Sequence, residues 1–130
     1  MMAKTSEILS YLRLLLPDGV VTDGRLTTYE EMAIIIIAAG LARLLEDTRS
    51  LTIYVSTRKL LRALGIDDIP SFMYAYIRRT LNTIARVYGV GTYQANGRTY
   101  FILDARRLKA LTKEEMAKEF TRIILEGDEA

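Results

Sequence analysis

The sequence predicts a small α+β domain that is mostly helical. Apolar residues recur at the three- and four-residue spacing of amphipathic helices over most of the chain. A β-branched run at 51–55 indicates a strand, and Asn96-Gly97 between two further runs is typical of a β-hairpin. A chain of 130 residues that is 50% hydrophobic can bury one core, so we predict a single domain over residues 1–130.

Two helices are predicted before the strand. The first covers residues 5–17, and its apolar stripe is Ile8, Leu12, Leu15 and Leu16. The second covers 28–46 and opens with a capping box, in which Thr28 and Glu31 bond each other's backbone amides. The apolar run around Ile34–Ile37 predicts a helix buried on nearly every side, either in the core or at a subunit interface. This run is shorter than the roughly 20 residues that cross a membrane.

A short helix and a long helix are expected after the strand at 51–55. Ser56 suits the N-cap of the short helix over 57–64, and Gly65 suits a left-handed end. The long helix covers 70–88 and is amphipathic. Its predicted buried stripe is Met73, Ile77, Leu81, Ile84 and Tyr88.

The hairpin is predicted over 92–103, with Tyr93 opposite Tyr100. Its turn at Asn96-Gly97 favours type I′, which needs positive φ at both positions. Residues 104–110 then form a basic connector.

A last helix is predicted over 112–126. It opens with a second capping box, formed by Thr112 and Glu115. Its apolar face is Met116, Phe120, Ile123 and Ile124.

The missing residue types exclude much catalytic chemistry. The chain has no Cys and no His, so it has no thiol nucleophile, no imidazole base and no Cys or His metal ligand. It also has no glycine-rich phosphate loop. We therefore expect no enzyme activity, no cofactor and no metal site. The composition suits a thermophile, and the absence of a signal-peptide pattern predicts a cytoplasmic protein.

The net charge of +2 hides an uneven distribution. Residues 52–109 carry 10 basic and 3 acidic side chains. Residues 1–51 carry 5 basic and 7 acidic ones, and residues 110–130 carry 3 and 6. A basic middle is typical of a chain that binds a polyanion. The other interpretation is a solvated surface whose charges cluster without function.

From residue 28 onward, the order of elements is helix, strand, short helix, long helix and hairpin. This order resembles the winged helix-turn-helix family, in the style of small archaeal regulators. The resemblance covers 28–103, adds helices at both ends, and rests on the strand, the two helices around Gly65 and the Asn96-Gly97 hairpin. It implies a mostly helical winged-helix fold. In that family the second helix of the turn unit enters the major groove of duplex DNA, and the hairpin serves as a wing.

The candidate DNA-binding residues lie on the outward side of helix 70–88 and on its neighbours. Arginine pairs with guanine edges or phosphates, and asparagine pairs with adenine edges. The long helix supplies Ser71, Arg78, Arg79, Asn82, Thr83 and Arg86. The short helix supplies Ser56, Thr57, Arg58, Lys59 and Arg62, and the hairpin supplies Asn96 and Arg98. Each residue also has a purely structural interpretation, such as a plain N-cap for Ser56 or a solvated helix face for the arginines.

Double-stranded DNA is the expected partner, and transcription regulation is the expected role. RNA fits less well, because the A-form major groove is too narrow for a helix. The apolar stripes of helices 5–16, 28–46 and 112–126 predict either an enlarged monomer core or a homodimer, and the habit of such regulators favours the dimer. The alternative function is a winged-helix module that contacts protein in a transcription or replication assembly.

Overall fold

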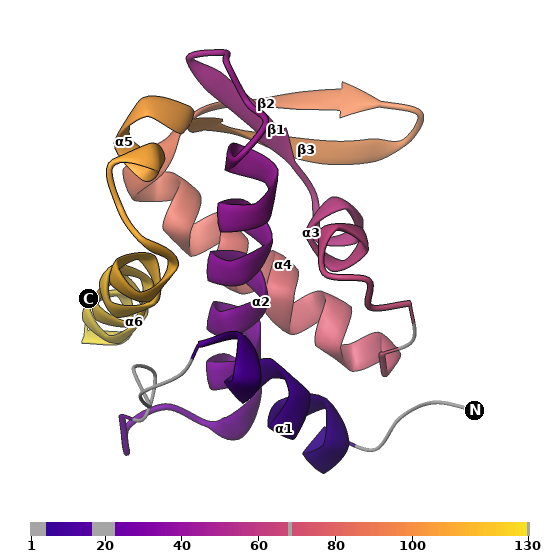
Figure 1. Cartoon of the computed structure of the whole chain (residues 1–130), viewed down its shortest axis with the longest axis vertical. Coiled ribbons are helices and arrows are strands. Elements are labelled where there is room, and N and C mark those ends of the chain that lie inside the picture. Colours follow the sequence, from indigo (N-terminus) through magenta and orange to yellow (C-terminus); the bar gives the residue numbers. More distant parts are fainter. Residues whose placement is uncertain (1–4, 17–22, 68, 130) are drawn as a thin grey trace.

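The computed structural model describes residues 5–16, 23–67 and 69–129. The elements in chain order are α1 (Thr5–Leu15), α2 (Thr28–Leu45), β1 (Thr52–Val55), α3 (Thr57–Ala63), α4 (Ser71–Tyr88), β2 (Gly89–Ala95), β3 (Arg98–Asp104), α5 (Ala105–Lys109) and α6 (Lys113–Glu129) (Figure 1). With 63% helix and a three-stranded antiparallel sheet, the chain has the predicted α+β class and a winged-helix-like arrangement. Position 17, the predicted end of the first helix, lies outside the described residues. Among the described helices, none is long and apolar enough to cross a membrane.

Helix α2 forms the centre of the core, and other helices surround it (Figure 1). The side chains of Ile34–Ile37 are at most 1% exposed. Helices α1, α3, α4, α5 and α6 all pack against α2. The prediction of a helix buried on nearly every side is confirmed, and its place is the core of the single chain.

The helices at the two ends of the chain join the same core. Ile8, Leu12 and Leu16 of the first stripe are buried, whereas Leu15 is only partly buried. The whole predicted face of α6 is buried: Met116, Phe120, Ile123 and Ile124. The chain itself therefore covers the apolar stripes, which is the enlarged monomer core.

The sheet lies at one end of the molecule (Figure 1). Its strand order is β1-β3-β2, and both pairings are antiparallel. The inner face buries Ile53, Val55, Phe101 and Leu103 in the core, while Tyr54 points outward and is exposed. The pairing of β1 with β3 adds a third strand to the predicted hairpin. The backbone N–H and C=O groups of β3 that do not hydrogen-bond to β2 therefore hydrogen-bond to β1.

The hairpin turns at Asn96 and Gly97, whose φ angles are 53° and 74°. Both values are positive, as the predicted type I′ turn requires. Tyr93 lies opposite Tyr100, which confirms the predicted register. Strand β2 begins at Gly89, earlier than predicted, and an irregularity between Gly89 and Gly91 shifts its pairing with β3.

Three predicted helix ends are confirmed, one predicted end is three residues short, since α6 continues past position 126 to Glu129, and two further details are wrong. Ser56 caps α3, Gly65 has a left-handed φ of 69°, and Thr112 and Glu115 form the capping box of α6. The capping box of α2 is formed by Thr27 and Glu30, one residue earlier than predicted.

The second wrong detail is the predicted connector at 104–110. It contains helix α5, because the Asp104 carboxylate accepts the amide protons of Arg106 and Arg107 and so starts a helical turn.

Candidate nucleic-acid interface

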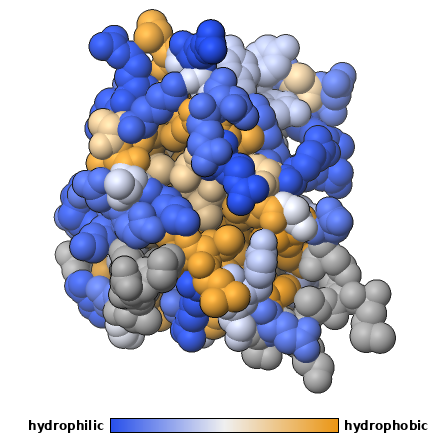
Figure 2. All heavy atoms as spheres, in the orientation of Figure 1, coloured by the Kyte–Doolittle hydropathy of each residue, from blue (hydrophilic) through white to orange (hydrophobic). Residues whose placement is uncertain are grey.

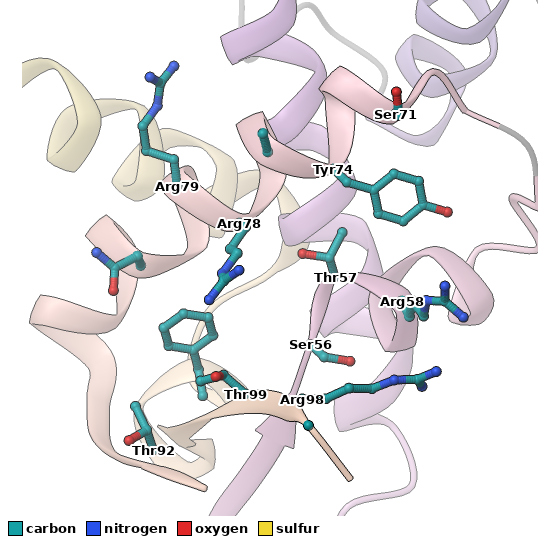
Figure 3. Close-up of a pocket in the computed structure, with 14 residues that line it drawn as sticks. Ser56, Thr57, Arg58, Ser71, Tyr74, Arg78, Arg79, Thr92, Arg98 and Thr99 are labelled. Atoms are coloured by element: carbon teal, nitrogen blue, oxygen red, sulfur yellow. The ribbon is translucent and has the colours of Figure 1, made fainter. Parts of the chain in front are cut away.

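A hollow of about 950 Å³ lies between α3, α4 and the hairpin (Figure 3). We call it the basic groove. Its lining residues are Ser56, Thr57, Arg58, Ser71, Tyr74, Ala75, Arg78, Arg79, Asn82, Thr92, Gly97, Arg98, Thr99 and Phe101. The start of α3, one side of α4 and the inner side of the hairpin therefore bring together most of the residues predicted to bind DNA.

The charge of the basic groove is of one sign. Four arginines line it and no carboxylate does. Arg58, Arg78 and Arg98 are exposed and make no ion pair or hydrogen bond with any described residue. In Figure 3, Arg78 extends from α4 toward the hairpin, and Arg98 extends toward Arg58. Three arginines without an internal counter-charge thus line one hollow.

The fourth arginine, Arg79, points away from the groove (Figure 3). Its guanidinium lies 4.8 Å from the centre of the Tyr76 ring, in a cation–π contact. Tyr76 in turn contacts Tyr29, which also contacts Phe72. Its guanidinium is therefore held on the outer side of α4, although the residue also lines the edge of the groove.

A second hollow, of about 420 Å³, lies on the other side of α4. It is lined by Glu30, Arg79, Thr80, Asn82, Thr83, Arg86, Ile124 and Gly127. Arg79 and Asn82 line both hollows, so they stand on the ridge between them. The outward residues of α4 therefore divide into a groove side, a ridge and a far side that holds Thr83 and Arg86. The Thr83 hydroxyl already donates to the carbonyl of Arg79 (3.1 Å).

The polar residues of α3 divide in a similar way. The Ser56 hydroxyl accepts the amide proton of Lys59 (3.2 Å), so Ser56 acts as the N-cap. The Lys59 ammonium donates to the carbonyl of Tyr54 (2.7 Å), away from the groove. Arg62 is exposed but does not line the groove. Of the three cations of α3, only Arg58 reaches the site.

The hairpin contributes a wall to the groove and an exposed tip. Thr92, Thr99 and Phe101 lie on its inner face, and Arg98 follows the turn. Thr99 also accepts a hydrogen bond from the Gln94 amide (2.8 Å). Asn96 is exposed at the turn and does not line the groove.

The basic residues after the hairpin hold α5 in place. Arg107 donates to the carbonyl of Val87 (2.8 Å) and lies 4.5 Å from the centre of the Tyr88 ring. Lys109 donates to the carbonyl of Thr48. Burial raises the pKa of the Tyr88 phenol, so this residue stays neutral beneath Arg107.

Six residues of the groove were not predicted from the sequence: Tyr74, Ala75, Thr92, Gly97, Thr99 and Phe101. Tyr74 and Ala75 follow Ser71 by three and four residues and precede Arg78 by four and three, so the helical repeat already indicated them. The hairpin residues depend on how the sheet packs near α4. No local signal in the sequence reports that packing.

No protein-family description, curated protein or solved structure matches this chain. Function is therefore inferred from the site itself. Among the described residues, no three His, Cys, Asp or Glu side chains gather as metal ligands.

Proposed function

We propose that the protein binds double-stranded DNA through the basic groove and α4, as a transcription regulator. One observation carries the proposal: Arg58, Arg78 and Arg98 line a single groove that is lined by no carboxylate. Arginines that lack a counter-charge in their own chain are available to phosphates, which they bind in a bidentate, charge-assisted way. Hydroxyl groups of Ser71 and Thr57 in the same lining are further donors.

The shape of the groove fits a single sugar–phosphate strand of a duplex. In B-DNA the major and minor grooves are separated by one such strand. A protein that places α4 in the major groove and the tip of the hairpin toward the minor groove must straddle that strand. The basic groove lies between these two elements, where the strand would pass.

This geometry assigns different tasks to the arginines. Arg58, Arg78 and Arg98 contact phosphates, because they line the groove that the strand follows. Arg79 and Asn82 stand on the ridge of α4, where they face the edges of the base pairs. Affinity then comes mainly from the groove, and sequence preference from the ridge.

Dimerisation remains part of the proposal. Two copies would address two half-sites of a symmetric operator. Because the apolar stripes of α1, α2 and α6 lie in the core, a dimer through these helices must use their outward residues.

The test measures binding to a fluorescent duplex at several salt concentrations. Replacing Arg58, Arg78 and Arg98 together by Ala should weaken binding to every sequence. It should also flatten the dependence of log K on log salt by about 0.9 for each lost phosphate contact. The matched control replaces Arg43, Arg49 and Lys118 by Ala, which removes the same charge from exposed positions outside the groove. Equal effects in the two variants, or no retention of duplex by the wild type at low salt, contradict the proposal.

A further inference from the structure

The outer face of the sheet is uncovered by any described helix (Figure 1). Side chains alternate between the two faces of a strand, and the inner positions are buried. The outer positions therefore include the polar Thr52, Arg98 and Asp104 at the ends of the strands, and between them lie Tyr54 on β1, Tyr93 on β2, and Tyr100 with Ile102 on β3. We call the latter four residues the tyrosine face.

The three rings of the tyrosine face form a cluster, in which Tyr93 of the edge strand β2 contacts both Tyr54 of the other edge strand and Tyr100 of the middle strand. Tyr54 and Tyr93 have ring centres 5.6 Å apart and planes inclined by 60°. Tyr93 and Tyr100 follow at 6.4 Å and 47°. The rings are tilted against each other and not stacked. Tyr54 and Tyr93 remain 42% and 49% exposed.

This composition is unusual for the outer side of an antiparallel sheet. Such a side normally carries polar residues where it faces water. Here it carries aromatic rings, and Leu51 and Val90 at the margins of the sheet are 63% and 61% exposed. Exposed large apolar residues that gather on one face indicate a binding surface.

Cations border the tyrosine face and link it to the basic groove. Arg98 is two residues before Tyr100 on β3, and its side chain also lines the groove. The Lys59 ammonium lies at the carbonyl of Tyr54. At the far end of β3, both nearby backbone amides of α5 donate to the carboxylate of Asp104. Arg98 therefore links the tyrosine face to the groove, and Arg106, Arg107 and Lys109 of α5 add positive charge beyond the far end of β3.

We propose that the tyrosine face binds unpaired bases of a nucleic-acid strand that continues from the basic groove. Exposed rings beside cations are the combination that holds single strands, since bases stack on the rings while cations neutralise the phosphates. Both faces of the sheet then contact DNA. Paired DNA lies on the inner side of the hairpin, and an unpaired segment lies on the outer side. This inference rests on the proposed function.

The experiment compares a blunt duplex with the same duplex carrying a single-stranded tail of thymidines. The wild type should bind the tailed duplex about five- to 150-fold more tightly for each base that stacks. Replacing Tyr54 and Tyr93 together by Ala should abolish this preference and leave blunt-duplex binding unchanged, because neither residue lines the groove. The matched control replaces both by Phe, which keeps the rings and should keep the preference.

Three outcomes overturn this inference. The first is a wild type that binds both duplexes equally, and the second is a preference that survives in the Ala variant. The third is a wild-type dimer, seen by light scattering, that becomes a monomer in the Ala variant, because a second copy then covers the face. Failure of the proposed function is a different result, since it requires that the wild type bind neither duplex. Unchanged blunt-duplex binding by the Ala variant also shows that the variant is folded.

Discussion

Helices α2 and α4 are both 18 residues long, but the chain uses them differently. Other helices surround α2, and it buries nearly all of its residues from Met32 to Leu41. Helix α4 buries only one stripe, from Met73 to Tyr88, and exposes the other side. Figure 2 shows that hydrophilic residues cover much of the visible surface, with apolar residues emerging between them. Apolar burial around α2 stabilises the fold. The outer side of α4 does not contribute to this core, so it can carry binding residues.

The comparison predicts that stability and binding can be lost separately, and the largest effect is expected in α2. Ile36 is 0% exposed at the centre of the core. Ile36→Ala removes buried methylene and methyl groups and leaves a cavity, so the free energy of unfolding should fall by about 2–5 kcal/mol. Urea unfolding followed by circular dichroism measures this loss. Binding to duplex DNA at a temperature where the variant is folded should be unchanged, and an unaltered unfolding midpoint contradicts the role given to α2.

The matching prediction for α4 concerns Asn82, which is exposed on the ridge. Asn82→Ala should weaken binding to the preferred sequence by about 1–3 kcal/mol, the value of one good side-chain pairing to a base. The free energy of unfolding should change by less than about 0.5 kcal/mol. Selection from random duplex DNA identifies the preferred sequence, and titrations at several salt concentrations complete the test. A weakening that is equal for all sequences would place Asn82 on phosphate and not on bases.

Local patterns in the sequence were enough to predict both helices. The run around Ile34–Ile37 has no polar side, and the stripe from Met73 to Tyr88 follows the helical repeat, so burial could be inferred without tertiary information. The hairpin followed from Asn96-Gly97 for the same reason, since the turn needs two residues that tolerate positive φ.

Features that depend on contacts between distant residues were not predictable. Thr27 and Thr28 are each followed by Glu three positions later, so two capping boxes fit the sequence. The structure selects Thr27 with Glu30, while Glu31 forms an ion pair with Arg13 of α1 (3.4 Å). In the candidate site, the helical repeat placed Arg86 on the outward face of the long helix and Arg78 at the flank of that face. It could not show that the two line different hollows.

A smaller effect is expected at Gly40, where α2 packs against α3. A Cβ at this position would lie 3.0 Å from Leu60 Cδ2 and 3.2 Å from the carbonyl oxygen of Leu60 in α3. In the Gly40→Ala variant, alanine has a higher helix propensity than glycine, but its Cβ would crowd the backbone of α3. Helix α3 would have to shift to make room. We expect a net loss of about 1 kcal/mol in the free energy of unfolding, since overpacking costs more than propensity returns.

The same substitution tests whether the core positions the groove. Because Arg58 is carried by α3, a shift of this helix should also weaken DNA binding by the folded variant. Thermal unfolding and duplex titration measure the two effects. A more stable variant with unchanged binding would show that α3 adjusts without cost.

The helix ends provide the last comparison. Helices α2 and α6 begin with capping boxes, whereas α4 begins after Pro70 with no side-chain cap. In α6, the Thr112 backbone amide donates to the Glu115 carboxylate (3.0 Å). This hydrogen bond, helped by the Thr112 side chain, holds the pKa of Glu115 below its usual value. A carboxyl group whose pKa is lowered by folding stabilises the fold above its unfolded pKa, about 4.3 for Glu. That contribution is lost as the pH falls through the folded value.

Glu115→Gln should therefore produce the smallest effect of the series, and one that depends on pH. The amide keeps an oxygen that accepts from Thr112 but cannot titrate. The Tm of the wild type should exceed that of the variant by a small, constant amount above about pH 5, and the difference should shrink in more acidic solution. Asp23, whose pKa Arg25 lowers, is present in both proteins, so its titration cancels in the comparison. A difference that stays constant into the acid range would mean that the Glu115 charge does not stabilise α6.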